Sequence, residues 1–200
     1  VRELLREGRM GDLRTFVGTF GYRLTPDNVR YDPGMGGGVL LDTGFYPVTM
    51  SRFCFEAEPI AVQARAHRVP EHGVDRLTSA ILEFPRGHAV FSVGMETFPV
   101  QRAQLIGTAG HMEMVNPWNP ATDRPSEIVL NTNPEIDQPA PPPLLVPAVD
   151  QYTLLAEQFA HAAQAGGAGP VPLEDSLKNM AVLDALRRSL SSGRAEPVEA

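Results

Sequence analysis

The feature that most constrains the fold is a run of strand-like segments separated by tight turns between residues 60 and 115. Pro85-Arg86-Gly87 and Thr108-Ala109-Gly110 have the composition of hairpin turns. Strands joined by such short turns pair antiparallel, because a parallel pair needs a long crossover. We therefore predict one large, mostly antiparallel sheet, with strands at residues 60–68, 76–84, 88–97, 102–107 and 111–115.

Two further segments extend this sheet, a long first strand at residues 12–24 and a short late one at 127–130. We expect one face to bury apolar side chains of the type of Ile81, Val90, Val93, Leu105 and Ile106. The other face is predicted to be polar or covered by a partner, because it would carry Arg76, Glu83, Glu96, Arg102 and Gln104.

Helical patterns flank the strands. Residues 39–53 have apolar spacing typical of a helix, although Pro47 removes an amide donor inside it. Two more helices are predicted at residues 149–165 and 173–190, after an irregular, proline-rich stretch at 116–147. The order of elements indicates an α+β fold with helices packed on one face of the sheet, in a single domain of residues 1–200.

Composition excludes several classes of function. A net charge of −7 argues against a general nucleic-acid binder, and no apolar stretch is long enough to span a membrane. Cys54 is the sole cysteine and the five histidines have no metal-ligand spacing, so we expect neither a disulfide nor a metal site. These features favour a soluble, cytoplasmic protein. The start at Val1, inside what reads as the end of a helix, favours a piece of a longer protein over a processed native N-terminus.

One segment concentrates groups that could do chemistry, the stretch from Gly36 to Tyr46. Its three consecutive glycines permit unusual backbone angles and a close approach to another surface. Asp42 and Tyr46 are four residues apart, so on a helix they project from the same face. A carboxylate beside a phenol could hold a polyol hydroxyl and exchange a proton with it. A glycine-rich turn, a helix-capping acid and a core tyrosine would give the same spacing, so both interpretations stay open.

The segment GGGVLLDTGFYPVTMSRFCFEAEP resembles the C-terminal domain of the glucose–fructose oxidoreductase / inositol dehydrogenase / MocA-type family. Tyr46 occupies the position at which that family has His or Tyr, and Arg52 with Glu58-Pro59 fits the later part of its pattern. The Tyr form is similar to the branch with xylose dehydrogenase and dihydrodiol dehydrogenase. GRMGDLRTFVGTF, LEFPRGHAVF, LIGTAGHMEM and LEDSLKNMAVLDALRRSLSSGR extend the resemblance over nearly the whole chain.

The resemblance implies an NAD(P)-dependent oxidoreductase of a sugar or polyol CH–OH group. Tyr46 would be its acid/base, and Asp42 would hold the substrate or the tyrosine. Arg30 could reach substrate or cofactor, and a role at the surface is an equal alternative. Gly37 and Gly38 are the candidate cofactor contacts. Members of the family also have a Rossmann domain with a GxGxxG turn and a Glu-Lys-Pro element whose lysine assists catalysis.

Neither of those motifs is in these residues, and Lys178 is the sole lysine. We therefore expect the chain to be the substrate-binding and assembly half of the enzyme, inactive and without NAD or NADP when isolated. The family also pairs through the open sheet face, so a homodimer or larger oligomer is expected. The alternative hypothesis is a non-catalytic module in which the sheet serves association alone.

Overall fold

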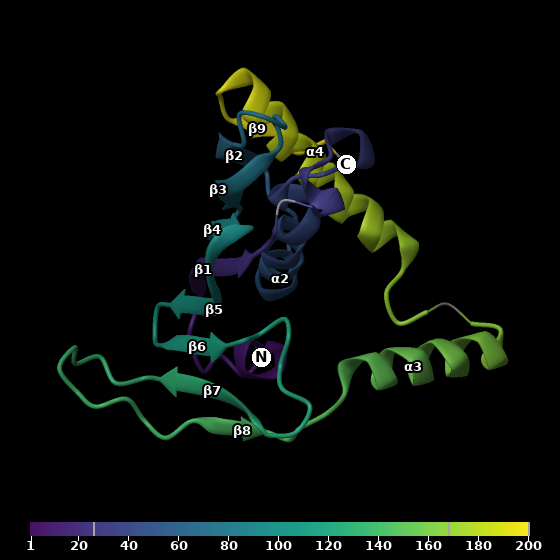
Figure 1. Cartoon of the computed structure of the whole chain (residues 1–200). Helices are drawn as coiled ribbons and strands as arrows, with labels where there is room; N and C mark the ends of the chain where they lie inside the picture. The colour runs from purple at the N-terminus through teal and green to yellow at the C-terminus, as the bar shows by residue number, and fades with distance from the viewer. Residues whose placement is uncertain (26, 168, 200) are drawn as a thin grey trace.

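A single twisted sheet forms the framework of the molecule (Figure 1). The structure is a computed structural model that describes residues 1–25, 27–167 and 169–199. Within these residues nine strands follow the order β8-β7-β6-β5-β1-β4-β3-β2-β9. Their bounds are β1 Leu13–Arg23, β2 Ala61–Arg68, β3 Asp75–Phe84, β4 Gly87–Gly94, β5 Glu96–Gly107, β6 His111–Val115, β7 Ser126–Asn131, β8 Leu144–Val146 and β9 Glu196–Pro197.

The sheet is mostly antiparallel, as the short turns predict. Hairpins join β2 to β3, β3 to β4 and β5 to β6, and each of these pairs is antiparallel. Among the described strands the exception is β1, which pairs parallel with β4 and antiparallel with β5. The first strand of the chain thus lies in the middle of the sheet, where it is paired on both sides.

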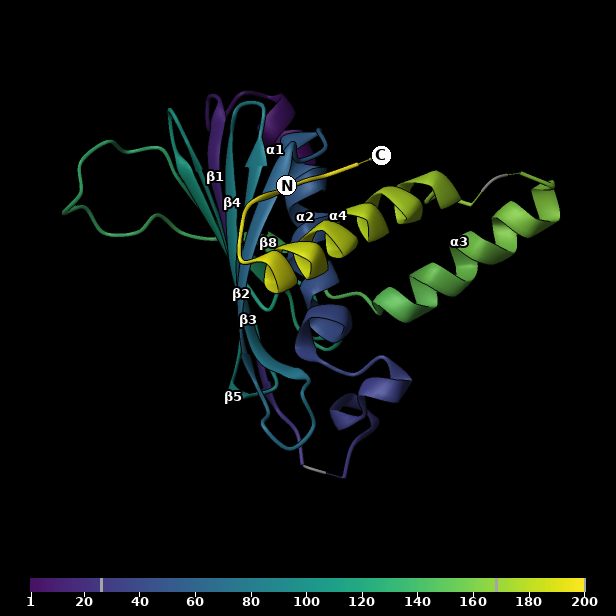
Figure 2. The ribbon, with the colours of Figure 1, turned by 90° about the horizontal axis from the view of Figure 1, so that it is seen from above.

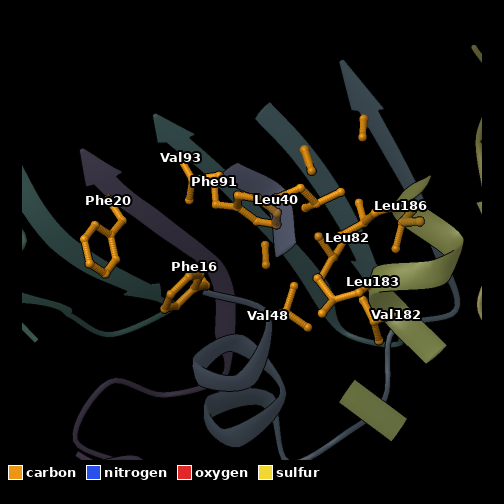
Figure 3. Packing of buried hydrophobic residues seen from close by; sticks show 14 of the residues in the cluster. Phe16, Phe20, Leu40, Val48, Leu82, Phe91, Val93, Val182, Leu183 and Leu186 are labelled. Atoms are coloured by element: carbon orange, nitrogen blue, oxygen red, sulfur yellow. The ribbon is translucent and has the colours of Figure 1, made fainter. Parts of the chain in front are cut away.

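The helices lie on one side of the sheet, which confirms the predicted α+β arrangement (Figure 2). They are α1 Arg2–Arg6, α2 Phe45–Phe55, α3 Gln151–Ala165 and α4 Leu173–Ser192. Figure 3 shows how α2 and α4 contribute to the core: Val48 and Leu186 point toward Phe16, Leu82 and Phe91 of the strands. All five side chains are buried, so the hydrophobic effect holds these two helices against the sheet.

The predicted buried face is correct in part. Val93 and Leu105 are fully buried, but Ile81, Val90 and Ile106 lie on the open face, where 39–49% of each residue is exposed. Successive residues of a strand point to opposite faces, and apolar residues at both Ile81 and Leu82 leave the choice of face undetermined in the sequence. Leu82 is the residue that enters the core.

The predicted helix at 39–53 forms as two parts. Leu40–Gly44 is a turn of π-helix, and α2 follows at Phe45–Phe55 with Pro47 in its first turn. The amide that Pro47 lacks falls where the helix changes from π to α geometry, directly after the π-helical turn. The proline therefore marks a change of helix type and does not end the helix.

The remaining elements differ from expectation mainly at their ends. Strand 88–97 stops at Gly94, and β5 starts at Glu96, well before the predicted residue 102. The proline-rich stretch contains the short strand β8, and a further strand, β9, pairs with β2. Both were missed because each is at most three residues long and has prolines within it or beside it.

A buried arginine joins α2 to α4. The side chain of Arg52 is only 4% exposed, and its guanidinium lies 2.6 Å and 2.9 Å from carboxylate oxygens of Glu58 and Asp175. It also donates a 3.2 Å hydrogen bond to the amide oxygen of Asn179. These contacts raise the pKa of Arg52 and fix the position of α2, which carries Tyr46.

Candidate functional site

Tyr46 lies at a cavity where β1, the turn after it and the π-helical turn meet. The cavity has a volume of about 650 Å³, which is within the range of small-molecule sites. Asp42 and Tyr46 both line it. Polar groups alternate with apolar ones in the rest of the lining: Phe20, Gly21, Tyr22, Leu24, Arg30, Thr43, Pro99, Val100, Gln101, Asn116 and Asn119.

The start of the π-helical turn is held by a buried carboxylate. Asp75 accepts hydrogen bonds from the Leu40 amide at 2.8 Å and from the Thr78 hydroxyl at 2.6 Å. Gly38 has a φ of +107° and lies against the same carboxylate, where a Cβ atom would collide with it. The glycine run is thus required for this close approach, which sets where Asp42 begins its turn.

Asp42 is held from two sides. The hydroxyl of Tyr22 on β1 donates a hydrogen bond to its Oδ2, and Nε of Arg30 lies 2.7 Å from its Oδ1. Burial and the neighbouring carboxylate raise the pKa of the Tyr22 phenol far above its usual value. Tyr22 therefore stays protonated and acts as a permanent donor to Asp42.

Tyr46 is half-buried among aromatic rings. Its ring centroid lies 4.0 Å from that of Phe45, 5.3 Å from that of Phe20 and 6.2 Å from that of Trp118. Burial raises the pKa of the Tyr46 phenol, and negative charge at Tyr152 or Asp42 would raise it further. The aromatic contacts hold the ring at the cavity, but the phenol here is a weaker acid than a phenol in water.

Of the sequence-predicted site residues, Tyr46, Asp42 and Arg30 come together, and Gly37 and Gly38 do not join them. The Gly37 amide donates to the carbonyl of Asp32 and the Gly38 amide to that of Arg30, each at 2.9 Å. Since both amides are used within the chain, these glycines present no cradle for a phosphate. They shape the loop and do not line the cavity at Tyr46.

Tyr22, Asn116 and Asn119 were missed by the sequence reasoning. Tyr22 reads as one more apolar position of a strand, and the asparagines lie in a loop without a periodic pattern. Asn116 has a φ of +51°, an uncommon backbone angle that sequence alone does not disclose. The one lysine, Lys178, lines a different cavity beside Arg52, where its Nζ is 4.0 Å from Glu58.

The glycine run does not have the geometry of a dinucleotide-binding turn. The glycine run follows short 3₁₀ turns, not a strand of a βαβ unit, and its amides at Gly37 and Gly38 are occupied. Among the described residues no group of three or more His, Cys, Asp or Glu side chains is arranged to hold a metal ion. The described helices include none that is long and apolar enough to cross a membrane.

Comparison with known proteins gives a consistent result. The chain is 36% identical to the uncharacterized oxidoreductase ORF334 of Rhizobium meliloti over 98% of its own length and 59% of the relative's. It is 28% identical to D-xylose 1-dehydrogenase (NADP(+)) 2 of Haloferax volcanii, over 93% of this chain and 56% of that protein. The chain thus spans less than three fifths of the length of these relatives.

The fold matches that of a solved relative. The 3-ketoreductase KijD10 from Actinomadura kijaniata, in complex with NADP and TDP-benzene, superposes with a TM-score of 0.85 at 26% identity, over 94% of this chain and 57% of that one. The family described as GFO/IDH/MocA C-terminal domain matches residues 1–113. The chain therefore belongs to the GFO/IDH/MocA family and corresponds to its C-terminal domain.

Proposed function

We propose that this chain is the substrate-binding and assembly domain of an NAD(P)-dependent oxidoreductase that acts on a CH–OH group of a sugar or polyol. The observation that carries the proposal is the cavity at which Tyr46 and the Tyr22–Asp42–Arg30 group lie together. Several relatives are named as oxidoreductases, and one is named for NADP(+). Residues 1–200 would form one domain of this enzyme, which would be a longer, cytoplasmic protein.

Tyr46 is the proposed catalytic acid/base. In oxidation its phenolate takes the proton of the substrate hydroxyl, and in reduction its phenol returns that proton to the oxygen. The raised pKa works against the phenolate, so the site needs a cation beside the phenol. Lys178 lines another cavity, and Arg30, a cation that lines this one, is paired with Asp42. The required cation must therefore come from outside the described residues.

Asp42 is proposed to orient the substrate. Its Oδ2 accepts a hydrogen bond from Tyr22 and its Oδ1 is ion-paired with Arg30; the two contacts hold the carboxylate still and leave further lone pairs for a substrate hydroxyl. A carboxylate with fixed orientation discriminates between hydroxyl positions better than a mobile one, because less freedom is lost when substrate binds. Arg30 is thus a positioning residue that acts through Asp42.

NAD or NADP would supply the redox chemistry, held by the rest of the longer protein. For this chain alone we expect neither turnover nor cofactor binding, since Gly37 and Gly38 have no free amides. Isothermal titration calorimetry with NADPH and with NADH tests this directly. Binding of either at micromolar concentration to the isolated chain would contradict it.

The decisive kinetic test is Tyr46→Phe in the longer protein. Loss of the proton-transferring hydroxyl should lower kcat by about 10²- to 10⁴-fold with little change in cofactor affinity. Tyr31→Phe is a matched control, because Tyr31 donates to Glu96 away from the cavity. An unchanged turnover in the Tyr46 variant would overturn the assignment.

A second role, association through the sheet, is favoured by the open face. The register aligns Ile81, Val90 and Val17 across β3, β4 and β1, and the first two are 49% and 39% exposed. Exposed apolar rows of this kind are typical of surfaces that bind a partner. We propose a homodimer or larger oligomer through this face, and in the alternative function this association is the sole role. A clean monomer at tens of micromolar in sedimentation would overturn the pairing.

A further inference from the structure

The cavity at Tyr46 has a second set of polar groups that the proposed proton transfer does not use. Gln101 comes from β5, and Asn116 and Asn119 come from the loop between β6 and β7. All three side chains line the same cavity as Asp42 and Tyr46, which belong to the π-helical turn and α2. We call Gln101, Asn116 and Asn119 the amide wall, because each of them carries a carboxamide.

The loop that carries the two asparagines is anchored to the sheet. The backbone amide of Asn116 donates a 3.2 Å hydrogen bond to the carbonyl of Gln101, and the backbone amide of Asn119 donates one of 3.1 Å to the side-chain Oε1 of Gln101. Trp118 stacks on Phe20 of β1, with ring centroids 5.5 Å apart and ring planes 8° from parallel. These contacts fix the loop, and with it the amide wall, at the side of the cavity.

The amide wall keeps hydrogen-bonding capacity after these contacts are made. Since Oε1 of Gln101 accepts from the Asn119 backbone, the NH2 group of Gln101 takes no part in that contact and keeps two donors. Within the described residues this NH2 group has no hydrogen-bond acceptor, and the side-chain amides of Asn116 and Asn119 have no hydrogen-bond partner. A carboxamide both donates and accepts, so it suits a ligand group that does the same, and a hydroxyl is such a group.

The charge of the cavity favours an uncharged ligand. Among the described residues of its lining, the charged side chains are Asp42 and Arg30, which lie 2.7 Å apart and therefore cancel. A phosphate or carboxylate that entered would have to break this pair or remain without a cation, and either costs free energy of desolvation. A hydroxyl that binds to the amide wall carries no such cost.

The apolar part of the lining fits the body of a sugar. The rings of Phe20 and Tyr46 lie 5.3 Å apart between their centroids and add apolar surface between the polar groups. A sugar ring has hydroxyls around its edge and C–H groups on its faces, which is the same alternation. The volume of about 650 Å³ is sufficient for one such molecule.

We infer that the amide wall is the subsite for a second hydroxyl of the substrate and that the cavity selects neutral, unphosphorylated sugars. The inference rests on the proposed function and deepens it: one hydroxyl reacts at Tyr46, and the amide wall binds another. Trp118 is a positioning residue that holds the wall against Phe20. Two relatives at 30% and 27% identity are named as reductases of a dTDP-linked sugar, so the inference also separates this chain from them.

The sole tryptophan of the chain provides the readout, because Trp118 lies within the loop of the amide wall. Its indole N–H gives a single resonance in nitrogen-15 NMR spectra of the isolated chain. D-xylose and D-glucose should shift this resonance to saturation, and D-glucose 6-phosphate and dTDP-glucose should bind about tenfold more weakly. Tighter binding of either anion than of the neutral sugars would overturn the inference, as would the absence of a shift with both neutral sugars.

Variants test whether the amides themselves bind the sugar. Asn116→Gly removes one carboxamide and tolerates the φ of +51° at that position, and Asn119→Ala removes the other. The double variant should bind D-xylose about tenfold more weakly than the parent chain. Gln101→Glu should also weaken binding, since it keeps the Oε1 that accepts from the loop and loses both donors.

Gln63→Glu is the matched control, because it makes the same change at an exposed position of β2 that does not line the cavity. It should bind D-xylose as the parent chain does. Urea denaturation of each isolated variant checks that it remains folded. A folded double variant that binds D-xylose as tightly as the control would overturn the inference.

Kinetics of the longer protein separate this inference from the proposed function. The double variant Asn116→Gly/Asn119→Ala should raise KM for the sugar about tenfold and change kcat little, because the amides bind a hydroxyl that does not react. A raised KM in this variant together with full activity of Tyr46→Phe would sink the proposed function and leave the amide wall standing. An inactive Tyr46→Phe enzyme with an unchanged KM in the double variant would do the reverse.

Discussion

Two arginine–carboxylate groups in this domain use similar chemistry with different surroundings. Arg52 is 4% exposed at its side chain and makes four hydrogen bonds, to Glu58, Asp175 and Asn179. Arg30 is 41% exposed and faces a cavity together with Asp42 and two phenols. The first group joins helices, and the second leaves room for a ligand. Both groups contain an arginine–carboxylate pair, so the pair itself does not mark a candidate site. The mark is that the Arg30 group is open to a cavity.

The largest effect is expected from Arg52→Ala. The change removes the guanidinium donor from two carboxylates and leaves the amide oxygen of Asn179 with the Thr49 hydroxyl alone, so the free energy of unfolding should fall by about 2–3 kcal/mol. Urea denaturation of the isolated chain measures it. Arg187→Ala, which removes an exposed pair with Asp184, should change stability by less than about 0.5 kcal/mol. If both variants lost the same free energy of unfolding, burial of the Arg52 ion pairs would not matter for stability, which would contradict the comparison.

Gly38→Ala should have the next largest effect. A side chain at φ +107° is strained, and its Cβ would also displace the Asp75 carboxylate, so we expect a loss of about 1–3 kcal/mol. Gly36→Ala is the control, because Gly36 also has a positive φ but a Cβ atom added there would have no neighbour within 4 Å. The control should lose about 1 kcal/mol. A Gly38 variant as stable as the Gly36 variant would refute the claim that Asp75 fixes this turn.

Of these variants, Asp42→Asn should change the stability of the domain least and the titration of Tyr22 most. Its pair with Arg30 is partly exposed, so less than about 1 kcal/mol should be lost. The negative charge that helps raise the pKa of Tyr22 is removed, so the phenolate of Tyr22 should form at lower pH. The near-ultraviolet absorbance of the phenolate, recorded as the pH is raised, measures this titration. The step that is missing from the Tyr22→Phe variant belongs to Tyr22. Asp184→Asn, an exposed acid on α4, should leave that titration unchanged.

The same phenols make stability sensitive to alkaline pH. Folding raises the pKa values of Tyr22, Tyr31 and Tyr46 above their ordinary value of 10.0. The folded state therefore holds these protons more tightly than the unfolded state, so the stabilisation is fully present below pH 10 and is lost as the pH rises through the folded pKa values. Urea midpoints that stay constant well above pH 10 would contradict these directions.

How much was predictable from sequence differs between the strands and the site. Tight turns revealed the antiparallel hairpins, and Asp42 and Tyr46, which the sequence spaces four residues apart, both line one cavity. The face of Ile81 was wrong because adjacent apolar residues satisfy either face. Tyr22 was missed since its contact with Asp42 joins residues 20 apart, and the pairing of β1 that positions it is a long-range property.

The central claim is that the catalytic phenol, Tyr46, lies in this chain, whereas the cation that lowers its pKa lies elsewhere in the longer protein. Carbon-13 NMR of ζ-labelled tyrosine, assigned with Tyr46→Phe, follows the titration of that phenol. We predict a pKa of Tyr46 above its ordinary value in the isolated chain, as burial requires, and well below that in the longer protein with cofactor bound. The same pKa of Tyr46 in both forms would contradict the account.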